Sequence, residues 1–149
     1  MPQRLEAAIS LARIAHAGQV DKAGNLVIDH ALGVMKDLSL QGLPEDYLIV
    51  GVLHDVVEDT EVTLDDLRRM GYSDAVINAV DAISRSGDEK YFDYILRVKE
   101  NPIARLVKIA DNRNNLERMD SLSEEKAGRL KERYVKSIQI LSSASWVSV

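Results

Sequence analysis

The feature that most constrains the fold is the segment from Tyr47 to Val57, which reads YLIVGVLHDVV and is apolar on nearly every side of a helix. Pro44 stands where the first residue of a helix is expected, so we predict one helix from there to about Val57. A helix that is apolar all round usually lies in the centre of a protein. His54 and Asp55 belong to this helix, and burying a carboxylate without a partner costs several kcal/mol. A structural salt bridge or a metal ion must therefore compensate Asp55.

Helical signals dominate the rest of the chain. Apolar spacing, N-cap residues and helix-stop glycines predict further helices over residues 5–16, 31–40, 63–70, 73–83, 89–99 and 102–118, and a last helix that begins at a capping box at 121–124. Residues 26–28 are predicted to form a short extended stretch before His30. Strand alternation, internal repeats and linkers are absent from the sequence. We expect a single all-α domain over residues 1–149, with roughly seven or eight helices and a frayed tail at 142–149.

Length and composition exclude several classes of protein. The 149 residues fit one domain, and the absence of cysteine excludes disulfides and thiolate metal sites. A net charge of −5 argues against broad nucleic-acid binding, because there is no basic excess to neutralise phosphates. The longest apolar run, residues 48–53, is far too short to cross a bilayer, and the N-terminus carries no signal-peptide pattern. We expect a cytoplasmic protein with no nucleic-acid or membrane partner.

Histidines and carboxylates converge on one predicted site. Asp111 lies one turn beyond Val107 on an apolar helical stripe, so its side chain is expected to point to the core. Together with His30, His54 and Asp55 it gives two imidazoles and two carboxylates. This donor set suits a borderline divalent ion such as Mn²⁺, Fe²⁺ or Zn²⁺, and it leaves coordination positions open for water and substrate, as in hydrolases. The alternative is a structural network of ion pairs.

A second pair of carboxylates follows one turn later. Glu58 and Asp59 lie four residues beyond His54 and Asp55, so in a continuing helix all four side chains would line one surface. Carboxylates beside a metal centre can orient a water molecule, take its proton and return one to a leaving oxygen. The plainer interpretation is a solvated helix end.

Three sequence blocks, at residues 15–19 (AHAGQ), 53–60 (LHDVVEDT) and 107–112 (VKIADN), extend this constellation. The order of His30, His54–Asp55 and Asp111 resembles the signature of the HD superfamily of metal-dependent phosphohydrolases. The three blocks are similar, more closely, to the hydrolase domain of RelA/SpoT proteins and to the small stand-alone hydrolases of that group. The resemblance extends over residues 4–134, almost the whole chain.

The resemblance implies an all-α HD domain with one divalent metal per chain, typically Mn²⁺, and a nucleotide substrate. The implied reaction removes pyrophosphate from the 3′ position of (p)ppGpp and leaves GDP or GTP, which would connect the protein to starvation signalling. The implied metal ligands are His30, His54, Asp55 and Asp111; the paired carboxylates that position and activate water are Glu58 and Asp59; the substrate contacts are Lys22, Asn115 and Tyr134.

The chain departs from this family in the region that recognises the substrate. Asp21 stands where the family has an arginine that packs against guanine, and a carboxylate cannot replace a planar cation. Val27 replaces an aromatic residue near the pocket, and Asn114 replaces a histidine. Two alternatives therefore stay open: an HD phosphohydrolase for another nucleotide or a phosphorylated cofactor, and a module that binds a nucleotide without turnover. The apolar tail around Trp146 leaves a homo-oligomer as a further alternative.

Three other features have both a structural and a functional interpretation. His16 lies on an apolar helix face, which is typical of a core histidine or of one that supports a site from behind. Arg118, seven residues after Asp111, either reaches a phosphate or is a surface arginine. The aromatic cluster at 91–94 is predicted to be core and not a platform on which a base stacks.

Overall fold

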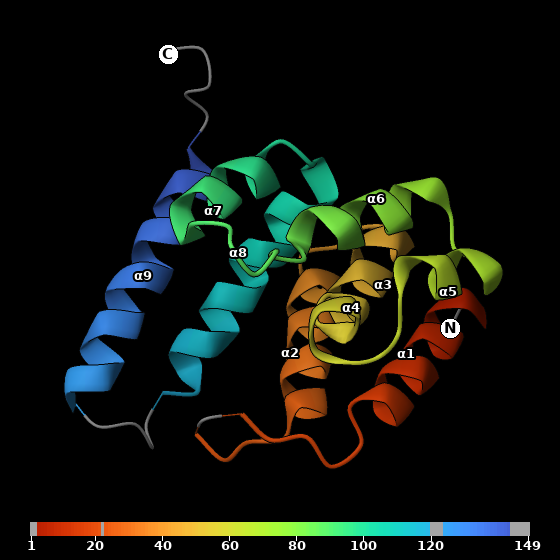
Figure 1. Cartoon of the computed structure of the whole chain (residues 1–149), viewed down its shortest axis with the longest axis horizontal. Helices are drawn as coiled ribbons and strands as arrows, with labels where there is room; N and C mark the ends of the chain where they lie inside the picture. The colour runs from red at the N-terminus through yellow and green to blue at the C-terminus, as the bar shows by residue number, and fades with distance from the viewer. Residues whose placement is uncertain (1–2, 22, 120–123, 144–149) are drawn as a thin grey trace.

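The computed structural model describes residues 3–21, 23–119 and 124–143, and helices make up nearly all of the ordered elements in these ranges (Figure 1). The elements are α1 (Gln3–Ala15), α2 (Val27–Leu40), α3 (Glu45–Leu53), α4 (Val56–Asp59), α5 (Leu64–Arg69), α6 (Asp74–Ile83), α7 (Tyr91–Lys99), α8 (Pro102–Glu117) and α9 (Glu124–Ser142). Apart from one isolated bridge between Val20 and Leu26, these residues contain no β-structure. The all-α prediction is confirmed, and α4 is a single turn that the sequence did not separate from α3.

Helix α3 lies at the centre, as its apolar sequence predicts. It packs against α1, α2, α6 and α8. Five consecutive residues, Ile49 to Leu53, are buried, which requires neighbours on every side of the helix. Figure 1 shows α3 between α1 and α2 on one side and α6 on the other. The end of α3, where His54 follows, is therefore held inside the protein.

The prediction of one helix from Pro44 to Val57 is wrong, because the helix breaks at His54 and Asp55. Asp55 has φ −100° and ψ −4°, outside the usual helical range, and α4 begins at the next residue. The Nδ1 atom of His54 lies 2.6 Å from the carbonyl oxygen of Gly51. In a continuing helix that carbonyl would accept from the amide of Asp55, so the imidazole takes the place of a backbone donor and stabilises the break.

The predicted extended stretch at 26–28 is also wrong beyond its first residue. Leu26 is extended, with φ −65° and ψ 131°, but α2 begins at Val27, four residues earlier than predicted. The bridge between Val20 and Leu26 closes the loop between them, and Gly24, at φ +83°, makes the turn. The chain therefore enters α2 directly, and His30 lies in the first turn of this helix.

Helix α8 carries Asp111 through the middle of the bundle. Asn101 caps it by accepting from the amides of Ile103 and Ala104, and Pro102 is its first residue, as the sequence predicts. The helix packs against α9 on one side and against α2 and α3 on another. Asp111 thereby faces the elements that carry both histidines.

Some predictions fall outside the described ranges. These are the first part of the capping box at 121–124, the tail beyond residue 143 with Trp146, and Lys22. Among the helices that the structure describes, none combines the length and the apolar character needed to span a bilayer.

The crossing of α2 and α3 generates a test of the packing. A Cβ atom at Gly51 would lie 2.7 Å from Cδ1 of the fully buried Leu38. We expect Gly51→Val to lower the free energy of unfolding by about 1–3 kcal/mol, because a full core has no room for the added methyl groups. The measurement is chemical denaturation, with Gly128→Ala in α9 as control, since a Cβ there meets nothing within 4 Å. Equal stability of Gly51→Val and the unchanged protein would contradict this packing.

Candidate metal centre and active site

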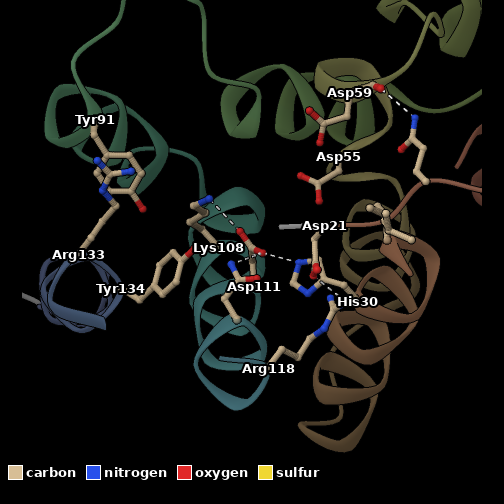
Figure 2. A pocket seen from close by; sticks show the side chains of 14 residues that line it. Asp21, His30, Asp55, Asp59, Tyr91, Lys108, Asp111, Arg118, Arg133 and Tyr134 are labelled. Atoms are coloured by element: carbon tan, nitrogen blue, oxygen red, sulfur yellow. Dashed lines mark hydrogen bonds and ion pairs between the residues drawn. The ribbon is translucent and has the colours of Figure 1, made fainter. Parts of the chain in front are cut away.

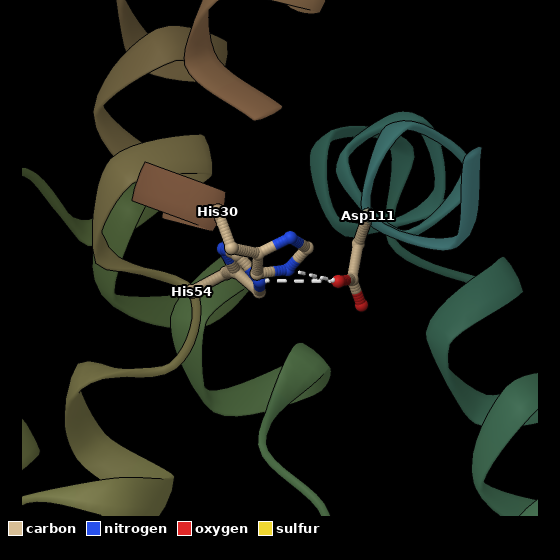
Figure 3. A group of neighbouring side chains, drawn as sticks. All are labelled: His30, His54 and Asp111. Atoms are coloured by element: carbon tan, nitrogen blue, oxygen red, sulfur yellow. Dashed lines mark hydrogen bonds and ion pairs between the residues drawn. The ribbon is translucent and has the colours of Figure 1, made fainter. Parts of the chain in front are cut away.

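Two histidines and an aspartate from three helices meet inside the protein (Figure 3). His30 comes from α2, His54 follows the end of α3, and Asp111 comes from α8. The Oδ1 atom of Asp111 lies 2.7 Å from Nε2 of His30 and 3.4 Å from Nε2 of His54. All three residues are buried. The structure thus brings together side chains that are up to 81 residues apart in the sequence.

Asp55, the fourth predicted ligand, lies against His54. Its Oδ2 atom lies 3.2 Å from Nε2 of His54, and its side chain lines the cavity beside the buried group. The break between α3 and α4 places it there, because the helix turns aside at this residue.

Hydrogen bonds hold both imidazole rings in one orientation. Nδ1 of His54 contacts the carbonyl oxygen of Gly51, and Nδ1 of His30 lies 2.6 Å from Oδ1 of Asn114. A ring that donates from Nδ1 to an oxygen keeps its Nε2 lone pair for a metal ion. Asn114 itself fits closely against Gly33, where a Cβ would come within 2.6 Å of its amide nitrogen.

Lys108 balances the charge of the buried Asp111 carboxylate. Its Nζ atom lies 2.8 Å from Oδ2 of Asp111, and Asn115 donates to Oδ1 at 3.3 Å. Burial by itself would raise the pKa of Asp111, but Lys108 and His54 hold that pKa well below its usual range. Burial would likewise lower the pKa of His54, yet Asp55 and Asp111 hold it well above the usual value. Asp55 and Asp111 therefore stabilise a positive charge at His54, which either a proton or a bound cation would supply.

A divalent metal ion fits this centre better than a closed network of ion pairs. Nε2 of His54 is buried and has no hydrogen-bond partner within the described residues. The donor atoms of His30, His54 and Asp111 lie within 4.8 Å of one another, which allows one ion to reach all three. Imidazole nitrogens combined with carboxylate oxygens suit a borderline divalent metal. An orphaned nitrogen facing two carboxylates is the arrangement that such an ion would satisfy.

Glu58 and Asp59 lie beside this centre, on the turn of α4. With Asp55 they form a second acidic group whose oxygens lie within 4.8 Å of one another. Burial raises the pKa of both carboxyls, and the charge of Asp55 adds to this in each case. Oε1 of Glu58 accepts from the backbone amide of Arg85 at 2.6 Å, whereas Asp59 lines the cavity. The break between α3 and α4 thus sets the position of Glu58 and Asp59, which differs from the one expected for a continuing helix.

His16 supports the same turn from behind. It is buried, and its Nδ1 atom lies 2.8 Å from Oε1 of Gln19. The amide of Gln19 in turn donates to the backbone carbonyl of Asp59 at 3.2 Å. The block at 15–19 therefore holds the α4 turn in place, which agrees with the supporting role that the sequence allowed.

A cavity of about 620 Å³ opens beside the centre (Figure 2), a size that suits a nucleotide. Of the predicted substrate contacts, Asn115 and Tyr134 line it, and Lys22 lies outside the described residues. Of the aromatic cluster predicted to be core, Tyr94 is buried, while Tyr91 packs against the core and also lines the cavity. The lining residues are Gln19, Val20, Asp21, Val27, His30, Asp55, Asp59, Tyr91, Lys108, Asp111, Asn115, Arg118, Arg133 and Tyr134.

Two cations of the cavity were not singled out from the sequence. Lys108 could have been found, because it lies three residues before Asp111 and so shares its helix face. Arg133 carries no such signal, because α9 approaches the site only through tertiary packing. Its guanidinium lies 4.4 Å from the centre of the Tyr91 ring.

The contact between His30 and Asn114 predicts a specific effect on metal affinity. Asn114→Ala should weaken the binding of a divalent metal ion by about 10–100-fold, because the ring of His30 loses the acceptor that orients it. Asn114→Asp is the matched control and should keep the affinity, since a carboxylate oxygen accepts from the same nitrogen. Calorimetric titration of the metal-free variants measures this. Equal affinity in Asn114→Ala and the unchanged protein would refute the orienting role.

Comparison with known proteins supports the same assignment. Residues 8–102 match the sequence model of the HD domain family, and this segment includes His30, His54–Asp55 and Glu58–Asp59, while Asp111 follows it. The chain is 32% identical over 133 residues to a GTP pyrophosphokinase of Streptomyces coelicolor, a match that covers 83% of this chain and 16% of the relative. It is 29% identical over 139 residues to the bifunctional (p)ppGpp synthase/hydrolase SpoT of Escherichia coli, covering 86% of this chain and 20% of that protein.

The chain thus spans a fifth or less of the length of these relatives. A solved structure, described as a metazoan ortholog of SpoT that hydrolyses ppGpp and plays a role in starvation responses, has the same fold. It matches with a TM-score of 0.79 and 22% identity, over 96% of this chain and 88% of that one. With the family match extending over more than half of the sequence and the histidines and aspartates of the centre in place, the chain belongs to the HD domain family.

Proposed function

We propose that the protein is a metal-dependent 3′-pyrophosphohydrolase that converts (p)ppGpp to GDP or GTP and pyrophosphate, with Mn²⁺ as its metal. One observation carries the proposal: the group of His30, His54 and Asp111, with Asp55 against His54, opens into the same cavity as Asp59. Support comes from relatives named for this reaction, among them a guanosine-3′,5′-bis(diphosphate) 3′-pyrophosphohydrolase of Aquifex aeolicus, 26% identical over 136 residues. A bound divalent ion supplies Lewis-acid polarisation of the phosphate and of a water molecule.

The residues of the chain divide the remaining work. Asp59 and Glu58, whose pKa values are raised by burial, take the proton of the attacking water. The water oxygen bonds to the phosphorus next to the 3′ oxygen, the bond between that phosphorus and the 3′ oxygen breaks, and the protonated carboxyl gives its proton to the 3′ oxygen. Lys108 and Arg133 stabilise the phosphate charge from the other side of the cavity.

Cations in the cavity would allow this acidic protein to bind an anionic substrate. The chain carries a net charge of −5, yet Lys108 and Arg133 line the cavity, and the third cation there, Arg118, is paired with Asp21. Asn115 and Tyr134 add neutral hydrogen-bonding groups to the cavity lining. The resemblance to RelA/SpoT hydrolases adds Lys22 as a proposed phosphate contact.

A second candidate is an HD phosphohydrolase for another nucleotide or for a phosphorylated cofactor. The observation that favours it is the substrate wall, where Asp21 and Val27 line the cavity in place of an arginine and an aromatic residue. A panel of nucleotides separates the two, because faster release of orthophosphate from another compound would favour the second.

The proposal is tested by product analysis of (p)ppGpp with metal-stripped protein, with and without Mn²⁺. We expect pyrophosphate and GDP or GTP only when Mn²⁺ is present, and we expect Asp55→Asn to abolish the reaction, because it removes one ligand of the ion. Turnover by the metal-stripped protein would overturn the proposal. Saturable binding of (p)ppGpp without turnover, at full metal occupancy, would instead favour a module that only binds its nucleotide.

The raised pKa values of Glu58 and Asp59 predict the pH dependence of the reaction. A carboxyl must be ionised to accept a proton, so kcat should rise with pH through a value above the ordinary carboxyl range of about 4. Glu58→Gln and Asp59→Asn should each lower kcat by about 100-fold or more and change the rise of kcat with pH on the acidic side of the profile. The control is Asp65→Asn on α5, an exposed carboxylate paired with Arg68, which should change neither. An unchanged pH profile in both site variants would exclude the pair from proton transfer.

A further inference from the structure

The two ends of the cavity differ in charge, and α8 connects them. Lys108, Asp111, Asn115 and Arg118 follow one another at intervals of three, four and three residues, so they form one stripe along this helix and its last turn. All four line the cavity. Arg118 lies seven residues beyond Asp111, a rise of about 10 Å along the axis. Figure 2 shows Arg133 with Tyr91 on one side of Asp111, and Arg118 with Asp21 on the other.

The guanidinium of Arg118 is fixed against the loop that precedes α2. Its Nη2 atom forms an ion pair with Oδ2 of Asp21 at 3.0 Å and donates to the carbonyl oxygen of Leu26 at 3.1 Å. The other oxygen of Asp21 accepts from the backbone amides of Ala23 and Asn25, so the loop itself holds the carboxylate. The Arg118 side chain is only 16% exposed. These contacts hold the guanidinium of Arg118 at the cavity wall.

The donors that remain on Arg118 have no protein partner in the described part of the chain. Hydrogen bonds are found there only for Nη2, which leaves the N–H groups of Nε and Nη1 for a ligand. Nε and Nη1 lie on different edges of the guanidinium, so each can donate a single hydrogen bond to an acceptor of the ligand.

The charge at this end favours a neutral ligand group over a phosphate. Asp21 neutralises Arg118 at 3.0 Å, and the neighbouring lining residues Val20 and Val27 are apolar. Asn115 adds a neutral amide. Apolar walls with a compensated guanidinium and an amide fit a flat, uncharged ring that carries acceptors on one edge, such as guanine with its O6 and N7 atoms.

The opposite end favours a polyanion. The guanidinium of Arg133 lies on the face of Tyr91, and no carboxylate pairs with it in the ranges that the structure describes. Lys108 lines the same side and already contacts one oxygen of Asp111. Cations without a full set of carboxylate partners retain charge for phosphate groups.

We infer that Arg118, aimed and neutralised by Asp21, binds the acceptor edge of the guanine base and determines base specificity, while the 3′-pyrophosphate lies toward Lys108 and Arg133. The inference rests on the proposed nucleotide substrate and names the residue that selects its base. It assigns a function to Asp21, which the sequence alone presents only as the loss of an arginine.

The test is direct binding, so that it does not depend on turnover. GDP, ADP and inorganic pyrophosphate are titrated separately by calorimetry into the Mn²⁺-loaded protein, its Arg118→Gln variant and the control Arg113→Gln. Arg113 lies on the same helix but outside the cavity, 3.8 Å from Asp37. We expect Arg118→Gln to weaken GDP binding by about tenfold or more and to remove the preference for GDP over ADP. Pyrophosphate affinity should change less than about twofold, and the control should behave like the unchanged protein.

Asp21→Asn is the second variant, since it keeps the acceptor for the loop amides and removes the charge that neutralises Arg118. The GDP-to-ADP affinity ratio should fall in this variant too. Equal loss of GDP and ADP affinity in Arg118→Gln, loss of pyrophosphate affinity, or no GDP preference in the unchanged protein would each overturn the inference. If the protein binds GDP base-selectively but does not hydrolyse (p)ppGpp, the proposed function is refuted and the inference stands. If the protein hydrolyses (p)ppGpp but Arg118→Gln keeps the preference for GDP over ADP, the inference is refuted and the proposed function stands.

Discussion

The buried carboxylate of Asp111 is the constraint on which the rest of the site depends. An ionised carboxylate in the interior is strongly unfavourable unless charges and hydrogen bonds surround it. Here α2 brings His30, the end of α3 brings His54, and α8 itself brings Lys108 one turn earlier. The packing of these three helices therefore also compensates the charge of Asp111. A helix shifted along either neighbour would separate the donors and leave the charge uncompensated.

The break at His54 and Asp55 turns this buried cluster into a site that is open to a ligand. In an unbroken helix the carboxylates at 55 and 59 would follow the buried surface of α3, since residues four apart share a face. Instead, Nδ1 of His54 forms a hydrogen bond with the carbonyl oxygen of Gly51, and the helix ends before Asp55. Asp55 and Asp59 thereby line the cavity, while Nε2 of His54 stays inside. The hydrogen bond between His54 and Gly51 thus stabilises the break that leaves His54 buried and places Asp55 and Asp59 at the cavity.

Sequence patterns were most informative where a single helix determines the result. The burial of α3, the Asn101 cap of α8 and the inward direction of Asp111 all follow from spacing within one element. The break after α3 could not be predicted, because apolar periodicity continues through it and only the histidine side chain interrupts the helix. The early start of α2 depends on the bridge between Val20 and Leu26, which pairs residues across a loop. Contacts between elements, such as Asp21 with Arg118 or Arg133 with Tyr91, leave no periodic signal in either segment.

A cavity with unlike ends also bears on how products leave. In the proposed arrangement the intact substrate is held at two places, its base near Arg118 and its 3′-pyrophosphate near Lys108 and Arg133. Two linked contacts bind more tightly than either alone, because the second forms at a high effective concentration. Cleavage of the bond between phosphorus and the 3′ oxygen removes the link, so each product keeps only its own end. Hydrolysis itself then weakens the binding of both products, and the acidic surroundings of Asp55 and Asp59 add repulsion against the newly freed pyrophosphate. In the proposed arrangement, the separation of charge along α8 serves both recognition and release, without requiring a moving element of the fold.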